Sequence, residues 1–240
     1  MWHVNILTLF PEIYPGPLKC SIPGKALEVG LWDISTKNIR DFASNKHKTV
    51  DSPPYGGGGG MVLRADVLGE AIEKFFLPNS FPIVYLSPRG KLFNQKMAKF
   101  FIQSAEGINI LCGRFEGVDE RVINEYKVME VSVGDYVLSS GDIASFAFID
   151  CCLRLLPGVL GNENSLKEES FGDGCYESLL EYPHYTKPVV WRSNKVPEVL
   201  TSGNHNKIKE WRINKAEEKT RDIRPDLWNK YLKGVKNEPS

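Results

Sequence analysis

Residues 82–117 read PIVYLSPRGKLFNQKMAKFFIQSAEGINILCGRFEG, and this stretch decides the fold class. It opens with a short apolar run, Pro82–Leu86, which is typical of a strand buried on both faces. Gln95–Gln103 then carries apolar residues at helical spacing, and Ile108–Cys112 is a second apolar run. Strand, helix and strand in alternation predict an α/β layer fold with a mainly parallel sheet.

The same alternation extends to both sides of this stretch. His3–Leu9 and Val128–Val133 are predicted strands, and Ala65–Leu77, Val118–Glu125 and Ile143–Leu156 are predicted helices. We therefore expect an α/β domain with a mainly parallel sheet and helices on both of its faces. Ligands of such sheets bind beyond the carboxyl ends of the strands.

The alternation stops in the polar, acidic and glycine-containing segment Asn162–Gly174. Such composition is typical of a connection between domains. Two further helices are expected beyond it, at Asn206–Thr220 and Pro225–Leu232. The predicted organisation is an α/β domain at 1–161, an interdomain linker at 162–175 and a small helical domain at 176–240.

Composition excludes several classes of protein. Of 240 residues, 42% are hydrophobic and 25% are charged, which is ordinary for a globular chain and excludes intrinsic disorder. No apolar run approaches the roughly 18 residues of a membrane span, and the first residues do not form a secretory signal. We expect a cytoplasmic protein without a membrane partner. The five cysteines are odd in number and lack C-x-x-C spacing, so they are expected to be reduced thiols.

The charge is distributed unevenly although the total is zero. Residues 176–240 contain 13 Lys and Arg against 9 Asp and Glu, a net charge of +4, which leaves −4 on residues 1–175. A basic C-terminal domain could meet phosphates. A solvated helical surface explains the same numbers, and charge alone favours that alternative.

Three predicted strands run into segments rich in glycine, serine or proline: Leu86–Gly90, Cys112–Gly117 and Ser132–Gly141. Glycine lets a backbone approach a ligand closely. One such loop has an ordinary explanation as a turn, but three loops at the end of one sheet favour a nucleotide-like pocket. Neither G-x-G-x-x-G nor G-x-x-x-x-G-K-[ST] occurs, so the dinucleotide and P-loop fingerprints are missing.

Other candidate residues have a structural explanation beside the functional one. The run Gly56–Gly60 is either a lid over a ligand or a flexible connection. Arg154, late in an apolar helix, either stabilises charge on a substrate or interacts with the helix dipole. Glu168 and Glu169 offer either a general base or a solvated acidic pair.

Basic and aromatic residues also mix in two segments of the C-terminal domain. These are His184–Lys187 and His205–Arg212, which contains Trp211. The mixture suits phosphate contact and base stacking. An amphipathic helix that buries Trp211 and Ile208 is the structural alternative, and both can hold together.

Taken in order, these segments resemble the bacterial tRNA (guanine-N1)-methyltransferase family, TrmD, of the SPOUT superfamily. Asp51–Met61 is similar to the family's V-D-x-x-P-Y-G-G-G-x-G-M loop, and the resemblance runs from Met1 to about Trp228. The other matching segments are Tyr85–Pro88, Cys112–Arg121, Gly134–Ser139, Arg154–Gly161, Pro183–Pro188 and Leu200–His205.

The resemblance implies a SPOUT domain tied in a trefoil knot, a homodimer with its active sites between the subunits, and S-adenosylmethionine as methyl donor. The substrate would be tRNA, methylated at N1 of the guanosine at position 37, next to the anticodon and preceded by another guanosine. The residues implied to bind the donor are Tyr85, Leu86, Ser87, Pro88, Gly113, Val133, Gly134, Asp135, Tyr136, Val137, Leu138 and Gly141.

On the substrate side, the resemblance implies that Arg154 and Glu116 engage the target guanine. The other residues carried over as substrate-binding are Tyr55, Gly58, His184 and His205. The family's general base is an aspartate in a D-S-F context, and Glu169-Ser170-Phe171 stands there in this chain. We therefore expect Glu169 to be the base and Arg154 to stabilise negative charge on O6.

Three further departures from the family pattern concern loop contacts: Arg89 in place of Gln, Ser140-Gly141-Asp142 in place of Gly-Gly-Glu, and Gly59 in place of Pro. Two alternatives remain open. One is an RNA-binding protein of the same fold without catalysis, and the other is a SPOUT methyltransferase of another RNA site. No group of residues in the sequence has the spacing typical of metal ligands. A magnesium ion, which the family is thought to use, is left unplaced.

Overall fold

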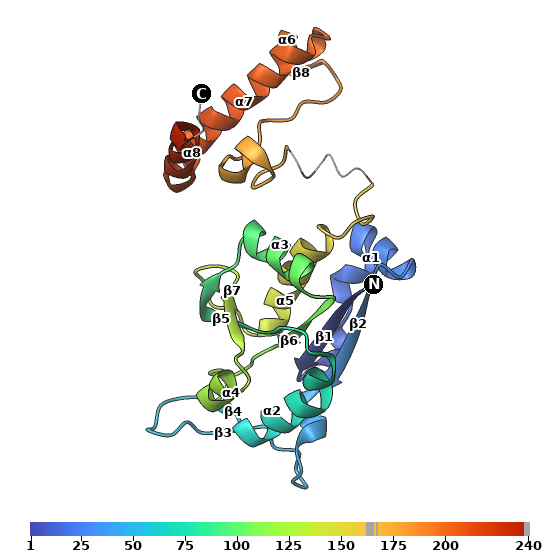
Figure 1. The fold of residues 1–240 in the computed structure, drawn as a ribbon, viewed down its shortest axis with the longest axis vertical. Coiled ribbons are helices and arrows are strands. Elements are labelled where there is room, and N and C mark those ends of the chain that lie inside the picture. Colours follow the sequence, from blue (N-terminus) through green and yellow to red (C-terminus); the bar gives the residue numbers. More distant parts are fainter. Residues whose placement is uncertain (162–165, 167, 238–240) are drawn as a thin grey trace. The chain divides into compact units, whose positions relative to one another are not determined.

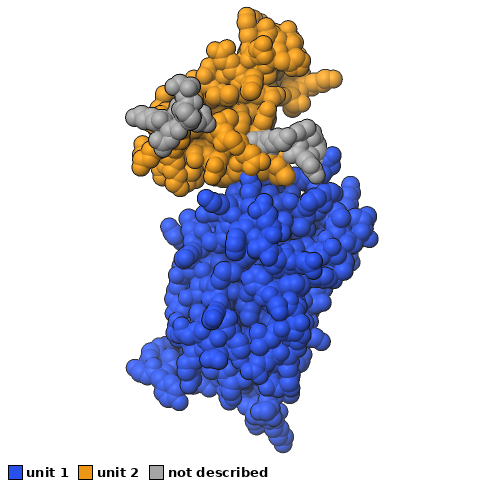
Figure 2. All heavy atoms as spheres, viewed as in Figure 1, with its two compact units in different colours: residues 1–161 blue, residues 162–240 orange. Residues whose placement is uncertain are grey.

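The computed structural model describes residues 1–161, 166 and 168–237. The chain divides into two compact units, Met1–Gly161 and Asn162–Ser240, which have different colours in Figure 2. Residues 162–165 and 167 of the expected linker lie outside the described residues. From Glu168 onward the expected linker is hydrogen-bonded to its own unit: the Glu181 amide donates to Ser170 Oγ at 2.9 Å, and the Phe171 amide donates to the Leu179 carbonyl at 3.4 Å.

Unit 1 is built on a five-stranded sheet in which every paired neighbour is parallel, as predicted (Figure 1). Its order is β2-β1-β6-β5-β7. The strands are β1 (Trp2–Thr8), β2 (Trp32–Asn38), β5 (Ile83–Leu92), β6 (Gly107–Leu111) and β7 (Met129–Ser132).

Helices cover both faces of this sheet, as predicted, because alternate strand residues point to opposite sides. Val84 and Leu86 of β5 face one core, and Ile83 and Tyr85 face the other. The first core is closed by α1 (Ser21–Glu28), α3 (Gln95–Ser104) and α5 (Gly141–Leu153); the second is closed by α2 (Ala65–Ala71) and α4 (Glu120–Glu125).

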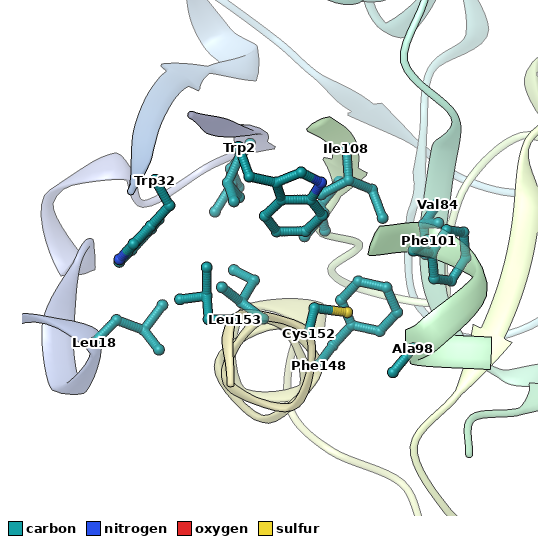
Figure 3. Packing of buried hydrophobic residues seen from close by; sticks show 14 of the residues in the cluster. Trp2, Leu18, Trp32, Val84, Ala98, Phe101, Ile108, Phe148, Cys152 and Leu153 are labelled. Atoms are coloured by element: carbon teal, nitrogen blue, oxygen red, sulfur yellow. The ribbon is translucent and has the colours of Figure 1, made fainter. Parts of the chain in front are cut away.

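Helix α5 is the centre of the first core. Figure 3 shows Leu153 of this helix on the side of Trp2, and Phe148 on the side of Phe101 and Ala98. All five side chains are at most 3% exposed. Fully burying a leucine or phenylalanine side chain contributes about 1.5–3 kcal/mol to stability. The packing therefore holds the C-terminal half of α5 firmly against the sheet.

The structure corrects several predicted boundaries. The predicted helix Ala65–Leu77 is α2 followed by a π-helical turn, Ile72–Phe76, and a 3-10 turn, Leu77–Asn79. Helix α5 ends at Leu153 and not at Leu156. Helix α1 and strand β2 were not predicted. Because β2 is an edge strand with only Trp32 fully buried, its sequence WDISTKN lacks an apolar run.

A small hairpin carries the glycine run. Strands β3 (Asp51–Ser52) and β4 (Val62–Leu63) pair antiparallel, and Leu63 also forms a parallel bridge with Val118. Residues 53–61 therefore form a loop whose two ends lie at the same edge of unit 1. The trefoil knot stays a prediction.

Unit 2 is mainly helical. It contains a 3-10 turn (Gly174–Ser178), the hairpin β8 (Val190–Trp191) and β9 (Asn194–Lys195), and helices α6 (Glu198–Thr201), α7 (His205–Ile223) and α8 (Pro225–Asn237). Tyr176, Leu179, Tyr182 and Ala216 form its buried core, and Trp211, Trp228 and Tyr231 pack against them. The hairpin and α6 were not predicted, since each strand is only two residues long.

Candidate functional site

A pocket lies where β6 and β7 end and their neighbour β5 bulges, and we name it the strand-end pocket. Its walls come from a bulge within β5, the loop after β6, and the loop from β7 into α5. The lining residues are Tyr85–Arg89, Gly113–Val118, Val131–Gly134, Tyr136–Gly141 and Ala144. The three loops expected from their glycine, serine and proline content therefore meet in one cavity.

The residues expected to bind the methyl donor lie in this pocket with one exception. Tyr85, Leu86, Ser87, Pro88, Gly113, Val133, Gly134, Tyr136, Val137, Leu138 and Gly141 all line it. Asp135 does not: its side chain is exposed although its neighbours on both sides line the cavity. Glu116, expected on the guanine side, also lines this pocket.

Bare backbone forms the floor of the pocket. A Cβ on Gly113 would lie 2.6 Å from Cε2 of Tyr85, and a Cβ on Gly141 would lie 2.9 Å from the Gly113 nitrogen. The Gly141 amide donates to the Gly113 carbonyl at 2.9 Å, which joins two of the three loops. Only glycine fits at these positions, so a flat ligand such as a nucleoside can approach main-chain groups directly.

The β5 wall differs from the predicted end of a strand. We expected the strand to stop at Leu86, but β5 continues to Leu92 with a shift in register against β7: both Leu86 and Lys91 pair with Val131. Residues 87–90 therefore bulge out of the strand, and their first three residues line the pocket. A Cβ on Gly90 would overlap the Glu130–Val131 backbone, so glycine is required where the bulge rejoins the sheet.

The third wall is the loop from β7 into α5, which is hydrogen-bonded at its start and exposed farther along. Ser132 Oγ donates to the Gly134 carbonyl at 3.0 Å, which turns the chain immediately after β7. Beyond that turn the side chains of Tyr136, Val137 and Leu138 are 55%, 86% and 38% exposed. Three neighbouring exposed apolar residues beside a cavity mark a surface suited to covering by a ligand or a partner.

Two arginines in the pocket were not singled out from the sequence as binding residues. Arg114 Nη1 donates to the Ser139 carbonyl at 2.9 Å, and its guanidinium lies 4.4 Å from the ring centre of Phe10. Arg89 pairs with Glu120 at 2.8 Å and with Glu130 at 2.9 Å. In the sequence, each of these arginines is a charged residue beside glycine in a loop. Spacing alone does not distinguish such a binding residue from a solvated surface arginine.

A buried polar cluster supports the pocket from behind. The Tyr14 hydroxyl lies 2.7 Å from Ser145 Oγ and 3.4 Å from Cys112 Sγ, and it donates to Asp142 Oδ1 at 3.2 Å. Thr8 Oγ1 donates to the same carboxylate oxygen. Burial raises the pKa of the Tyr14 hydroxyl and the pKa of the Cys112 thiol, so both groups keep their protons near neutral pH. The cluster ties β1 and β6 to the start of α5.

The glycine run reaches the pocket at one end only. The Glu116 amide donates to the Met61 carbonyl at 2.9 Å, and a Cβ on Gly60 would overlap the Glu116 side chain. Tyr55 is 99% exposed and lines a second cleft beside α2 and α4, and Gly58 has open space around it. The structure therefore does not bring Tyr55 or Gly58 to the strand-end pocket.

Arg154 also lies away from the pocket within one chain. It is the half-buried residue that follows α5, while the pocket lies at the other end of this helix, at Gly141. A 13-residue helix is about 20 Å long. A single protomer therefore does not unite Arg154 with the strand-end pocket.

Glu169 belongs to unit 2, where its carbonyl accepts a hydrogen bond from the Gly172 amide at 2.9 Å. Its neighbour Glu168 accepts from Tyr182 at 3.0 Å and from Arg212 at 2.9 Å. The Arg212 guanidinium lies 4.7 Å from the ring centre of Tyr182. Glu168 is thus a structural residue of unit 2.

The two histidines expected to bind substrate are exposed on unit 2. His184 Nε2 lies 3.6 Å from Glu181 Oε2, and the His184 ring lies 5.0 Å from the ring of Tyr182. His205 is the first residue of α7, directly after the capping residue Asn204. These positions leave both imidazoles on the surface of the unit.

The described residues offer neither a metal cluster nor a helix that could span a membrane. Within residues 1–161, 166 and 168–237, no three His, Cys, Asp or Glu side chains cluster in a way that could hold a metal ion. None of the helices in the same ranges has both the length and the apolar character needed to cross a membrane. The magnesium ion considered from the sequence has no support here.

Comparison with known proteins gives a consistent result. Residues 1–230 match the family model described as tRNA (Guanine-1)-methyltransferase TrmD. A tRNA (guanine-N(1)-)-methyltransferase of Ruegeria sp. (strain TM1040) is 52% identical over 96% of this chain and 93% of its own length. Proteins of the same name from Rhodospirillum rubrum and Pelagibacter ubique are 52% and 50% identical, over 95% and 97% of this chain and 92% and 100% of their own lengths. The chain therefore belongs to the TrmD family of tRNA (guanine-1)-methyltransferases.

Proposed function

We propose that this enzyme transfers the methyl group of S-adenosylmethionine to N1 of the guanosine at position 37 of tRNA, next to the anticodon and after another guanosine. The observation that carries the proposal is the strand-end pocket, where nearly all residues expected to hold the donor line one cavity. Because tRNA is the substrate, we also infer that the protein works in the cytoplasm.

The pocket residues fit this donor. Bare backbone at Gly113 and Gly141 can accept the flat face of a nucleoside, and the strand-end loops offer amide and carbonyl groups to its edge. Burial raises the pKa of the Tyr85 hydroxyl, so this ring stays neutral beside the cavity. When bound, the donor supplies a methyl group already activated on a sulfonium sulfur.

The protein must then make guanine N1 nucleophilic, because N1 holds its proton at neutral pH. We assign Glu169 as the general base that accepts this proton. As the proton leaves, negative charge spreads onto O6, and the guanidinium of Arg154 stabilises it. Glu116, on the pocket wall beside the glycine run, contacts the guanine.

We further propose a homodimer in which Arg154 of one protomer serves the strand-end pocket of the other. The argument is the length of α5, which separates Arg154 from the pocket of its own chain by about 20 Å. A two-fold dimer supplies each pocket with the residue that its own chain cannot deliver.

The remaining residues bind the RNA in this proposal. Tyr55 and Gly58 contact it from the exposed hairpin loop, and His184 and His205 contact it from the surface of unit 2. Residues 176–240 of unit 2 carry a net charge of +4, which suits RNA phosphates.

The activity is tested by transferring labelled methyl from S-adenosylmethionine to two tRNA transcripts. One has guanosine at positions 36 and 37, and the other has adenosine at 37. We expect label on the first transcript only. Label on neither, with the protein folded and magnesium present, would favour the binding-only alternative. Label on both would favour another RNA site.

Mixed dimers test the shared active site. Arg154→Ala and Gly113→Val each disable one half of a site, so each homodimer should be inactive. If the halves come from different protomers, a one-to-one mixture restores about a quarter of the wild-type sites. Activity that stays absent in a mixture proven to contain mixed dimers would place both halves in one chain.

A further inference from the structure

The short hairpin of unit 2 has an unusual turn. Its strands pair Val190 with Lys195 and Trp191 with Asn194, so only Arg192 and Ser193 connect them. Both connecting residues have positive φ, 47° and 68°. Two-residue hairpin turns of this kind favour asparagine and glycine, because other side chains are strained there. The hairpin thus presents an arginine at its tip where glycine would be less strained.

The tip places an arginine side chain over an exposed tryptophan ring. The Trp191 side chain is 59% exposed, and the Arg192 guanidinium lies 4.9 Å from the centre of its ring. Val190 points to the opposite face of the strand, since alternate residues of a strand face opposite sides. Figure 1 draws this hairpin at the end of unit 2 that lies away from α8. Trp191 therefore contributes nothing to the core formed by Tyr176, Leu179, Tyr182 and Ala216.

The segment that contains the hairpin is basic. Residues 183–197 contain no Asp or Glu, but they contain Lys187, Arg192 and Lys195 together with His184. Tyr185, in the same segment, is 49% exposed. Exposed aromatic rings among positive charges are the two elements with which proteins bind unpaired nucleotides. An apolar protein partner would not need the positive charge.

We propose that Trp191 and Arg192 form a stacking site for an unpaired base of RNA, with Lys195 contacting a neighbouring phosphate. A base inside a double helix exposes no face, so the ligand is a nucleotide in a loop or at an end. This inference rests on the proposed function, because the RNA in question is the tRNA substrate.

Trp191→Ala in the full-length protein tests the site directly. The dissociation constant of unmethylated tRNA should rise about tenfold, within the range found for loss of one base–aromatic stack. The dissociation constant of S-adenosylmethionine and the turnover at saturating tRNA should not change. Trp191→Phe should recover most of the RNA affinity, because a ring remains available for stacking.

Two further variants separate stacking from other effects. Val190→Ala removes apolar surface from the opposite face of the same strand and should leave RNA affinity unchanged. Lys195→Gln removes one positive charge and should reduce the slope of log affinity against log salt by about 0.7, the value for one phosphate of a single strand.

Several outcomes would overturn the site. One is unchanged RNA affinity in Trp191→Ala. Another is an equal loss in Val190→Ala, which would indicate damage to the hairpin. A third is a changed molecular mass in Trp191→Ala, which would make a second copy of the chain the occupant. RNA affinity is measured without methyl transfer, so wild-type protein that binds tRNA but does not methylate it contradicts the proposed function and leaves this test intact.

Discussion

The strand-end pocket and the residues expected to act on guanine are organised in opposite ways. The pocket is complete within unit 1, where backbone contacts such as that between Gly113 and Gly141 join its loops. The guanine-side residues are dispersed: Arg154 follows the far end of α5, and Glu169 belongs to unit 2. In the proposed homodimer, one folded chain builds the donor side by itself, whereas the acceptor side needs RNA and a second protomer to assemble.

This difference has a chemical consequence. A donor site built from backbone groups tolerates few changes, because a Cβ at its glycines would overlap neighbouring atoms. An acceptor site built from side chains outside the strand-end pocket can be disabled without disturbing donor binding. Variants of the two regions should therefore separate affinity for the donor from the rate of methyl transfer.

The largest effect is expected on the acceptor side, from Glu169→Gln. Removing a general base lowers the rate of the chemical step by about 10² to 10⁴. The dissociation constant of S-adenosylmethionine should stay as in the wild type. Single-turnover transfer to tRNA measures the rate, and calorimetry measures donor affinity. Glu169→Asp is the matched control, since it keeps the carboxylate; near-normal turnover in Glu169→Gln would remove Glu169 from the mechanism.

Thiol labelling tests how well the buried polar cluster behind the pocket is shielded from solvent. Cys112 is buried behind Gly113 and its thiol pKa is raised, whereas Cys20 and Cys175 are exposed. At pH 8 we expect Cys112 to react at least about 100-fold more slowly than these two, because reaction requires local opening. Mass spectrometry after timed alkylation gives the rates.

The same raised thiol pKa predicts a pH dependence of stability. The folded protein keeps a proton on Cys112 that the unfolded chain releases near its ordinary pKa of about 9. The free energy of unfolding is therefore retained below that pH and falls as the pH rises above it.

In the labelling experiment, rapid reaction of Cys112 in the folded protein would show that the pocket floor opens readily.

A smaller effect is expected from Gly113→Ala. The added methyl would lie 2.6 Å from the Tyr85 ring, and overpacking of this kind costs about 1–3 kcal/mol. Donor affinity should fall about tenfold. Gly161→Ala serves as the control because a Cβ there meets nothing within 4 Å. Equal donor affinity in both variants would show that close packing at Gly113 is not required for donor binding.

The smallest effect is expected from Arg89→Gln. Arg89 lines the pocket, but its side chain is 60% exposed and its partners Glu120 and Glu130 balance its charge. Exposed ion pairs contribute about 0–1 kcal/mol. Donor affinity should change less than about threefold. A loss above tenfold would mean that Arg89 contacts the donor itself.

Much of the fold followed from hydrophobic pattern. Strand β6 and helix α3 were predicted to within one residue at each end, and the buried first half of β5 was also predicted. Buried parallel strands are apolar runs, and helices repeat every 3.6 residues. Edge strand β2 escaped prediction because only one of its faces is buried. The bulge at residues 87–90 escaped it because a register shift depends on the neighbouring strand β7, which lies about 40 residues away in sequence.

By itself, the sequence determined the α/β class, the three glycine-containing strand ends and the motifs of the TrmD family. Local spacing carries these features, since strand, helix and turn preferences act over a few residues. The sequence also favoured a pocket at the three loops. Only the tertiary structure decided that β5 bulges to form one of its walls, that Arg114 joins two of the loops and that Arg154 lies a helix length away. Contacts between distant segments depend on packing of the whole sheet, and no spacing along the chain reports them.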